Sequence, residues 1–340
     1  MQQRIIRLIA EIDEFKGLWH GIQGMPEESL NSMKRFATIE SIGSSTRIEG
    51  AALSDEEVED LLHGLETRSF RSRDEQEVAG YALAIRLVYD AWGEMNLTES
   101  MIKGMHRQLL QYSAKDEWHL GEYKHHPNHV AAFDKDGRQI GIVFETVSPF
   151  DTPMAMTDLI RETRQNLDDP DIHPLITIGD FVVRFLAIHP FQDGNGRLAR
   201  ILTNLLLLRS GYTYVPYSSL ERLVEANKEE YYRALRSSQK SLDTPEPDTS
   251  LWLLFFLELL KKQKDLLQQA IDREKDLSVL PELSRTILEI ARQRGRVTPA
   301  DVQRLAGANR NTIKGHLKSL VEQGRLVLHG KGRGAHYTLL

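Results

Sequence analysis

The chain has 340 residues, of which 41% are hydrophobic and 27% charged, and its formal net charge is −6. This length accommodates two or more domains, and the apolar content excludes a wholly disordered chain. The sequence has no cysteine, which excludes a disulfide scaffold, a zinc ribbon and a thiol nucleophile. The charge argues against a protein that is basic throughout.

Neither the first residues nor the most apolar window matches a targeting or membrane pattern. Residues 1–17 lack the long apolar core and the small-residue cleavage site of a signal peptide. The most apolar window, residues 251–260, is too short to span a bilayer and contains Glu258. We therefore expect a cytoplasmic protein with a buried helix at this window.

Apolar residues three and four positions apart predict helices along most of the chain, so the expected fold class is mainly α. Ser54 precedes one such stripe, and Glu57 three residues later completes the pattern of a capping box. Residues 128–144 are the exception, because the Asp136–Gly137 pair lies between short, partly β-branched runs. This pattern predicts a β-hairpin inside a helical protein.

Residues 189–200 read HPFQDGNGRLAR and follow the apolar segment FVVRFLAI. Gly194 and Gly196 can turn successive backbone N–H groups toward one point, and the residues that follow have helical spacing. The loop would then feed a helix N-terminus, which favours a phosphate group. Arg197 and Arg200 lie three residues apart and would project from neighbouring places on the first turn.

Asp193 and His189 extend this prediction to chemistry. Asp193 is the one acid in a cationic loop, and we expect it to hold a magnesium ion that bridges phosphate oxygens. His189 would act as a general base on an incoming hydroxyl. The alternative is an ordinary glycine-containing turn that caps a helix, but seven such residues at fixed offsets favour the phosphate site.

The pattern His-Pro-Phe-x-Asp-Gly-Asn-Gly-Arg-x-x-Arg is the signature of Fic-domain proteins, and this chain resembles that family over roughly residues 30–240. Fic proteins have an all-helical core, and most transfer AMP from ATP to a hydroxyl side chain of a target protein. The resemblance implies that His189 deprotonates the hydroxyl and that Asp193 coordinates Mg²⁺ on the α- and β-phosphates. It also implies that Gly194, Asn195 and Gly196 form an anion nest. Arg197 and Arg200 would bind the β- and γ-phosphates, and Phe191 would anchor the loop in the core.

The hairpin at 128–144 is similar to the family's flap, which aligns a target segment by strand addition. The arginine often seen before that flap is Lys124 here, so target positioning is the weaker part of the resemblance. The Doc relatives, which phosphorylate, carry a lysine near the position of Gly196. Glycine at this position leaves room for the triphosphate and favours adenylylation.

Residues 44–50, SSTRIEG, by themselves read as a helix end with Gly50 as terminator. They also resemble the family's inhibitory motif, in which Ser45, Glu49 and Gly50 would be the defining residues. The resemblance implies that Glu49 pairs with Arg200, in the class whose inhibitory helix is N-terminal. A glutamate on Arg200 would misplace the ATP phosphates and stall transfer.

Residues 281–340 differ from the rest in charge. They carry eleven Lys and Arg against four Asp and Glu, a net of +7, so the other 280 residues must carry −13 to give −6. Thr298 as N-cap and Pro299 start the second of three predicted helices, and a strand, a glycine-rich turn and a strand follow. This order resembles a winged helix-turn-helix. The candidates for DNA contact are Arg310, Asn311, Lys314 and Lys318 on the last helix and Lys331 and Arg333 in the wing.

A module of this kind can instead bind a protein or dimerise, with its charges merely solvated. The whole chain is expected to comprise an N-terminal helical region (1–100, with the motif at 45–50), a Fic core (101–240), a connecting helix (241–280) and the winged helix (281–340). We place the domain boundary near Leu277–Pro281, where a charged helix ends at a proline.

The combined prediction is an autoinhibited protein adenylyltransferase that uses ATP and Mg²⁺ and modifies a Ser, Thr or Tyr hydroxyl of a target protein, itself included. A homodimer would suit both the inhibitory helix and the helix-turn-helix. One alternative is a DNA-binding transcriptional regulator that uses the Fic fold as a nucleotide sensor, and another is a Fic transferase with a different nucleotide donor. Tyr231 and Tyr232 are candidates for the adenine side of the pocket or for a place in the core.

Overall fold

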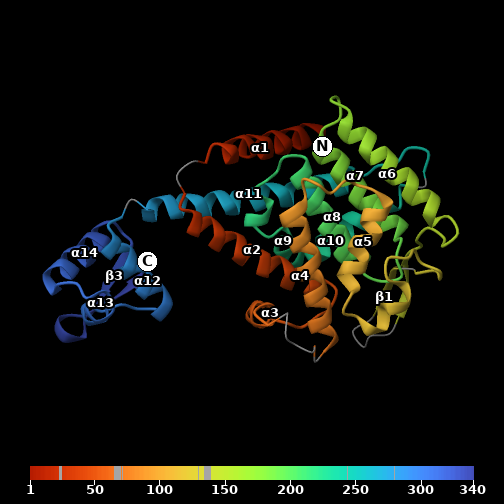
Figure 1. The fold of residues 1–340 in the computed structure, drawn as a ribbon. Helices are drawn as coiled ribbons and strands as arrows, with labels where there is room; N and C mark the ends of the chain where they lie inside the picture. Colours follow the sequence, from red (N-terminus) through yellow and green to blue (C-terminus); the bar gives the residue numbers. More distant parts are fainter. Residues whose placement is uncertain are drawn as a thin grey trace. The chain divides into compact units, whose positions relative to one another are not determined.

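The computed structural model describes the chain except for residues 23–24, 65–69, 71, 129, 134–138, 243 and 279. The described residues form two compact units, residues 1–267 and 268–340, and helices make up most of both (Figure 1). The boundary expected near Leu277–Pro281 lies within the second unit, because Leu277 and Leu280 pack against that unit's core. No described helix is long and apolar enough to cross a membrane.

The first unit is built from helices joined by short connections. α11 (Ser250–Ser278) begins in this unit and continues past residue 267 into the second. The other helices of the unit are α1 (Gln2–His20), α2 (Glu27–Ile48), α3 (Asp55–Leu62), α4 (Arg73–Ala91), α5 (Glu99–Leu110), α6 (Thr152–Asp168), α7 (Pro174–Ile188), α8 (Asn195–Arg209), α9 (Leu220–Ala226) and α10 (Lys228–Gln239), with the short 3₁₀ helices η1 (Ala114–His119) and η2 (Val215–Tyr217).

α8 is the central helix of this unit. Its residues from Leu198 to Leu208 are all buried, including the polar Arg200, Thr203 and Asn204. It packs against α7, α4, α5 and α2, which surround it in Figure 1. α8, which begins directly after the loop of residues 189–194, is therefore supported by four helices that precede it in the sequence.

The capping box predicted before α3 is confirmed. The Ser54 hydroxyl accepts the Glu57 N–H at 3.2 Å, and the Glu57 carboxylate accepts the Ser54 N–H at 2.8 Å. Two backbone donors that a helix start leaves unpaired are satisfied reciprocally in this way. The cap fixes where α3 begins.

The predicted hairpin is also present. β1 (Val130–Phe133) and β2 (Gln139–Phe144) pair antiparallel, with Val130 opposite Phe144 and a shifted register on either side of Ala131 and Ala132. The Asp136–Gly137 turn falls outside the described residues. The hairpin is the only sheet in the described part of the first unit.

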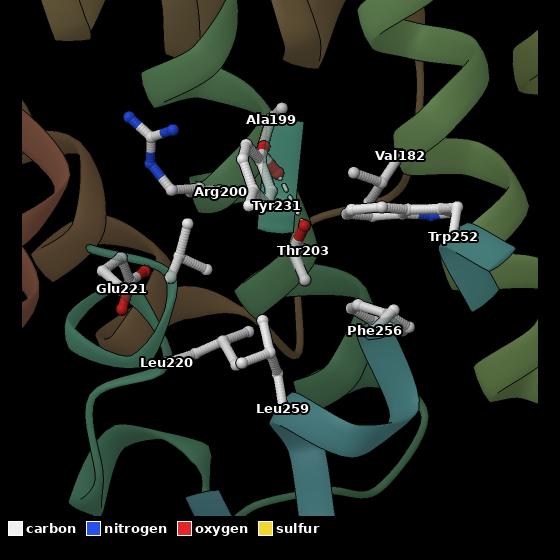
Figure 2. Close-up of a pocket in the computed structure, with 11 residues that line it drawn as sticks. Val182, Ala199, Arg200, Thr203, Leu220, Glu221, Tyr231, Trp252, Phe256 and Leu259 are labelled. Atoms are coloured by element: carbon white, nitrogen blue, oxygen red, sulfur yellow. Dashed lines mark hydrogen bonds between the residues drawn. The ribbon is translucent and has the colours of Figure 1, made fainter. Parts of the chain in front are cut away.

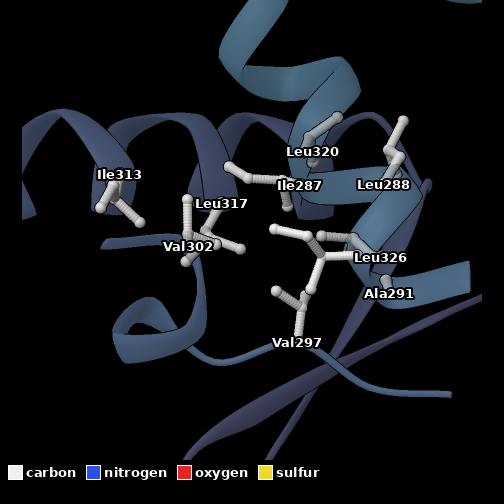
Figure 3. Close-up of a cluster of buried hydrophobic side chains, with 10 residues drawn as sticks. Ile287, Leu288, Ala291, Val297, Val302, Ile313, Leu317, Leu320 and Leu326 are labelled. Carbon is white, nitrogen blue, oxygen red and sulfur yellow. The ribbon is translucent and has the colours of Figure 1, made fainter. Parts of the chain in front are cut away.

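The second unit has the three helices and the strand–turn–strand that the sequence predicts. Val302, Ile313, Leu317 and Leu320 point into one shared core (Figure 3). Thr298 caps the second helix, since its hydroxyl accepts the Asp301 N–H at 3.2 Å. The elements are α12 (Glu282–Arg294), α13 (Pro299–Ala306), α14 (Arg310–Glu322), β3 (Leu326–His329), η3 (Gly332–Gly334) and β4 (His336–Leu339), with β3 and β4 antiparallel.

Candidate active site

The loop of residues 189–194 joins α7 to α8 and starts with an unusual backbone conformation. His189 has φ 51° and ψ 60°, and it is the one non-glycine residue with a positive φ in the described chain. Left-handed geometry is uncommon for histidine and is found preferentially at functional sites. It ends α7 abruptly and turns the chain into the loop.

The His189 ring is held as a neutral base. Its Nδ1 lies 3.3 Å from the Leu186 carbonyl oxygen, which can only accept, so Nδ1 carries the proton and Nε2 the lone pair. Burial lowers the pKa of His189 to about 4, and the nearby positive charge of Lys124 acts in the same direction. An imidazole in this state can accept a proton at neutral pH.

Phe191 anchors the loop, and a histidine that the sequence analysis missed supports it. The fully buried Phe191 ring stacks on His106 of α5, with centroids 3.9 Å apart and planes at 10°. His106 Nδ1 accepts the Gly121 N–H at 2.9 Å, which leaves its Nε2–H to donate to the Asp193 carbonyl oxygen at 3.1 Å. Burial lowers the pKa of His106 to about 4, so this neutral tautomer persists.

Asn195 fastens the loop from the other side. Its Oδ1 accepts the Phe191 N–H at 2.9 Å, and its Nδ2 donates to the Phe191 carbonyl at 2.7 Å. Both polar atoms of this buried side chain are thus used within the loop. The donor that Asn195 leaves free at the start of α8 is its backbone N–H.

The start of α8 has the features of an anion site. Gly194 is the N-cap at φ 80°, where a side chain would be strained. The N–H groups of Asn195, Gly196 and Arg197 lie in the first turn of α8, where no carbonyl of the same helix can accept them. Their donors and the helix dipole make this end attractive to a negative group.

Glu49 supplies a negative group at this end. α2 ends at Ile48, and Gly50, at φ 107°, turns the chain away after Glu49. Glu49 Oε1 accepts a hydrogen bond from Arg200 at 2.7 Å, and a Cβ built on Gly196 would collide with the same oxygen. The carboxylate therefore lies directly on the first turn of α8, and Gly196 has no side chain that would exclude it.

Ser45 completes the contact between α2 and Arg200. Arg200 Nε donates to the Ser45 hydroxyl at 2.8 Å, and its Nη2 donates to the Ser45 carbonyl at 2.9 Å. Burial would lower the pKa of Arg200, but the Glu49 carboxylate raises it above its usual value, so the guanidinium stays charged. Ser45 and Glu49 thus form one cluster with Arg200, which lies 155 and 151 residues from them in sequence.

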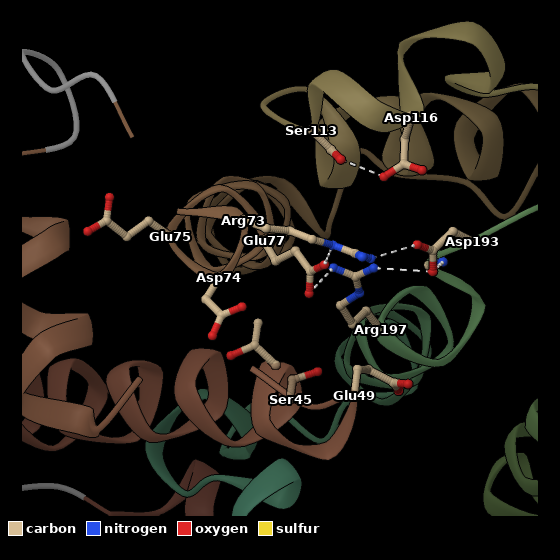
Figure 4. Close-up of polar contacts among 12 residues, drawn as sticks. Ser45, Glu49, Arg73, Asp74, Glu75, Glu77, Ser113, Asp116, Asp193 and Arg197 are labelled. Atoms are coloured by element: carbon tan, nitrogen blue, oxygen red, sulfur yellow. Dashed lines mark hydrogen bonds and ion pairs between the residues drawn. The ribbon is translucent and has the colours of Figure 1, made fainter. Parts of the chain in front are cut away.

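Arg197 belongs to a second charged cluster, a ring of four residues (Figure 4). Its side chain is only 2% exposed and lies 3.1 Å from Glu77 and 3.4 Å from Asp193. Arg73, the first residue of α4, lies 2.7 Å from Glu77 and 3.4 Å from the other oxygen of Asp193. Arg73 and Glu77 are not predicted from the sequence, because no motif marks them.

The state of Asp193 suits a cation ligand. Burial tends to raise its pKa, but Arg197, the Gly194 N–H and Arg73 together lower it, so the carboxylate is ionised. Its side chain is 36% exposed. Among the described residues no group of three or more His, Asp or Glu could hold a metal ion, so a metal at Asp193 would need oxygen ligands from phosphates and water. Those are the ligands Mg²⁺ takes in nucleotide sites.

Beside Arg200 lies a small cavity of about 20 Å³, with room for about one water. Tyr231, Thr203 and Trp252 line it, and the Arg200 guanidinium points away from it (Figure 2). Tyr231 is buried and packs edge-on against Trp252 and Tyr232. Tyr231 is thus a core residue in this state, whereas Tyr232 is half-buried.

The candidates for DNA contact lie on the surface of the second unit. Arg310, Asn311, Lys314 and Lys318 of α14 are all exposed, and Lys318 has an exposed partner, Glu322, at 3.6 Å. Lys331 is exposed as well. The side chain of Arg333 falls outside the described residues.

Comparison with known proteins places this geometry in a family. Residues 96–207 match the Fic/DOC family. The chain is 25% identical over 240 residues to the Protein adenylyltransferase Fic of Drosophila melanogaster, which covers 70% of this chain and 44% of that protein. The Drosophila yakuba protein of the same name is 26% identical over 240 residues, 43% of its length. The chain thus spans less than half of the curated relatives it matches.

Solved structures agree at the level of the fold. A Fic family protein from Desulfovibrio desulfuricans G20 superposes with a TM-score of 0.62 at 23% identity, over 99% of this chain and 96% of that one. A Fic domain containing signaling protein from Bacteroides thetaiotaomicron gives 0.62 at 26% identity, over 78% of this chain and 97% of that one. The mainly α-helical fold is a Fic fold with a small C-terminal two-stranded hairpin. Residues 96–207 thus match the Fic/DOC family, and the chain is distantly similar to the Fic protein adenylyltransferases.

Proposed function

We propose that this chain transfers AMP from ATP to a Ser, Thr or Tyr hydroxyl of a target protein, itself included, and that Glu49 restrains the transfer. The observation that carries the proposal is the position of the Glu49 carboxylate, on Arg200 and on Gly196 at the start of α8. A negative group is already bound where the helix end and the arginine favour a phosphate. The γ-phosphate and Glu49 cannot occupy that place together.

In the proposed reaction the hydroxyl proton passes to Nε2 of His189 while the hydroxyl oxygen bonds to the α-phosphorus. The bond from that phosphorus to the β-phosphate oxygen breaks, and pyrophosphate leaves. Asp193 would hold Mg²⁺, which when bound neutralises phosphate charge. Arg200, released from Glu49, would bind the γ-phosphate, and Arg197 the β-phosphate. Gly194, Asn195 and Gly196 would form the anion nest, with the N–H groups of Asn195 and Gly196 as its donors, because the Gly194 N–H donates to Asp193.

The test is incubation with α-labelled ATP and Mg²⁺, followed by denaturing electrophoresis. We compare the wild type, Glu49→Gly and Glu49→Gly/His189→Ala. Label that is low in the wild type, rises with Glu49→Gly and vanishes with the second change supports an adenylyltransferase restrained by Glu49. Label that persists without His189 contradicts its role as the base. Equal label in the wild type and Glu49→Gly contradicts the brake.

Two alternatives have distinct outcomes. A DNA-binding regulator that uses the Fic fold as a nucleotide sensor would bind nucleotide and DNA but transfer nothing even after Glu49→Gly. A transferase with another donor, such as a CDP-alcohol, would label protein only from that nucleotide. The neutral base at His189 favours a transferase over a sensor, because a sensor needs no base.

We also propose that residues 281–340 form a winged helix-turn-helix that contacts DNA. The support is the row of exposed basic residues on α14, on a segment of net charge +7. Binding to a labelled duplex that weakens steeply with salt supports contact with phosphates. Dimer formation at this unit without DNA binding would favour the alternative, a module for protein contacts.

A further inference from the structure

Lys124 is a buried lysine whose side chain points at the loop of His189. It lies between η1 and β1, and the residue is only 2% exposed. Its Nζ donates three hydrogen bonds, each of 2.9 Å, to Asn128 Oδ1, Thr146 Oγ1 and the Ile188 carbonyl. All three ammonium protons are therefore used, and each partner is a neutral oxygen.

These partners belong to two different parts of the site. Asn128 lies just before β1 and Thr146 just after β2, so they are the two feet of the hairpin. Ile188 is the last residue of α7, directly before His189. Lys124 thus ties both feet of the hairpin to the residue that precedes the candidate base.

Further bonds run between the same two parts. Asn128 Nδ2 donates to the carbonyls of His189 at 3.2 Å and Phe191 at 2.6 Å, and the Lys124 N–H donates to the Pro190 carbonyl at 2.9 Å. The base of the hairpin therefore contacts every carbonyl from residue 188 to residue 191. A shift of one part must be transmitted to the other.

The number of protons on Lys124 matters for this arrangement. A neutral amine has two protons and a lone pair, so it cannot donate to three oxygens and would direct the lone pair at one of them. Burial lowers the pKa of Lys124 to about 8, within reach of ordinary assays. The titratable groups around it are His189, the exposed His125 and His126 of the same loop, and the exposed Glu145 beside Thr146.

We propose that Lys124, as an ammonium, is the positioning residue that joins the hairpin to the His189 loop, so that a target held by the hairpin meets the base in register. This rests on the proposed function. In this role Lys124 touches neither nucleotide nor target. It acts through the Ile188, Asn128 and Thr146 contacts.

The first experiment measures transfer against pH in the Glu49→Gly background, from about pH 6 to about pH 10. With Lys124 present, transfer falls as pH rises above about 8, because the third hydrogen bond is lost. Lys124→Arg keeps its charge throughout and abolishes this fall. Lys124→Met lowers transfer about tenfold or more below about pH 8 and shows no alkaline fall of its own, with ATP affinity unchanged. Lys103→Arg, at a lysine that lies over the ring of Tyr123, is the matched control and keeps the fall.

The second experiment needs no transfer activity. Hydrogen exchange of the β1 and β2 amides, corrected for intrinsic rates, is compared at about pH 7 and about pH 9.5. Protection falls at the higher pH in the wild type but not in Lys124→Arg, and it is already low in Lys124→Met. Exchange that is the same in all three proteins, or an alkaline fall in transfer that persists in Lys124→Arg, would overturn the proposal. Absence of transfer in every variant would count against the proposed function alone, and exchange would then decide for Lys124.

Discussion

The two sets of basic residues expected to meet phosphate are held in different ways. Arg197 and Arg200 are buried, and each pairs with a glutamate, Glu77 of α4 and Glu49 at the end of α2. Arg310 and Lys314 on α14 are exposed. A buried cation with fixed partners selects a ligand by geometry as well as charge, whereas an exposed one acts mainly through charge. The first set suits one small anion, and the second an extended one.

The largest effect is expected for a substitution in the first set, Arg197 and Arg200. In the Glu49→Gly background, Arg200→Ala should lower the rate of AMP transfer about a thousandfold, or about 4 kcal/mol, because the γ-phosphate loses its charged partner. The measurement is the initial rate of label incorporation. Arg310→Ala in the same background is the control and should leave that rate unchanged. Equal losses in both variants would contradict the distinction between the two sets.

The next effect concerns stability. Glu77→Gln removes the nearer of the two carboxylates beside the buried Arg197 and should lower the free energy of unfolding by about 3 kcal/mol. Glu49→Gln should cost only about 1 kcal/mol, because Glu49 is 30% exposed and Arg200 keeps its two bonds to Ser45. Denaturant titration of the two variants gives both values. A larger loss for Glu49→Gln would reverse this ranking.

The burial of His189 also predicts how the rate of transfer depends on pH on the acid side. In the proposed reaction the neutral form of His189 would be the base, and this form is present above its pKa of about 4. Transfer by Glu49→Gly should therefore stay constant down to about pH 5.5, where an ordinary histidine base would already have lost about tenfold. A pH–rate profile at saturating ATP and Mg²⁺ checks this. A midpoint near the ordinary histidine value would show that the ring is solvated.

How far the sequence predicts this molecule depends on how local each feature is. The helix caps, the hairpin and the loop of residues 189–200 are encoded in short contiguous patterns, and their positions follow from them. His106 and Glu77 lie in sequence that carries no motif, and Lys124 is marked only by its place before the hairpin. They meet the loop because the folded chain brings together residues 64–87 positions apart, or more than a hundred for Glu77. Asn195 lies in the motif, but its two side-chain hydrogen bonds to the backbone of Phe191 depend on the folded shape of the loop.

A smaller effect is expected for a substitution in the second unit, residues 268–340. Thr298→Ala removes the side-chain cap of α13 and should destabilise the second unit by about 1 kcal/mol. Nucleotide binding by the first unit should not change. Thermal unfolding with and without ATP checks both statements, and a loss of ATP affinity would show that the units depend on each other.

The smallest effect concerns one exposed cation. Lys314→Ala should leave the stability of the chain unchanged within about 0.5 kcal/mol. It should weaken DNA binding about equally for all sequences and reduce the slope of log affinity against log salt by about 1. Titration of a labelled duplex at several salt concentrations gives the slope. An unchanged slope would remove α14 from the DNA-binding proposal.

The position of Glu49 has a consequence for the way ATP would compete with it. A carboxylate tethered to α2 is an intramolecular competitor, so its effective concentration at Arg200 does not fall when the protein is diluted. The degree of restraint would then depend on nucleotide concentration and on how firmly the end of α2 is docked. Linkage makes this coupling reciprocal: a triphosphate that displaces Glu49 must weaken the docking of α2 by the same factor by which docked α2 weakens the triphosphate.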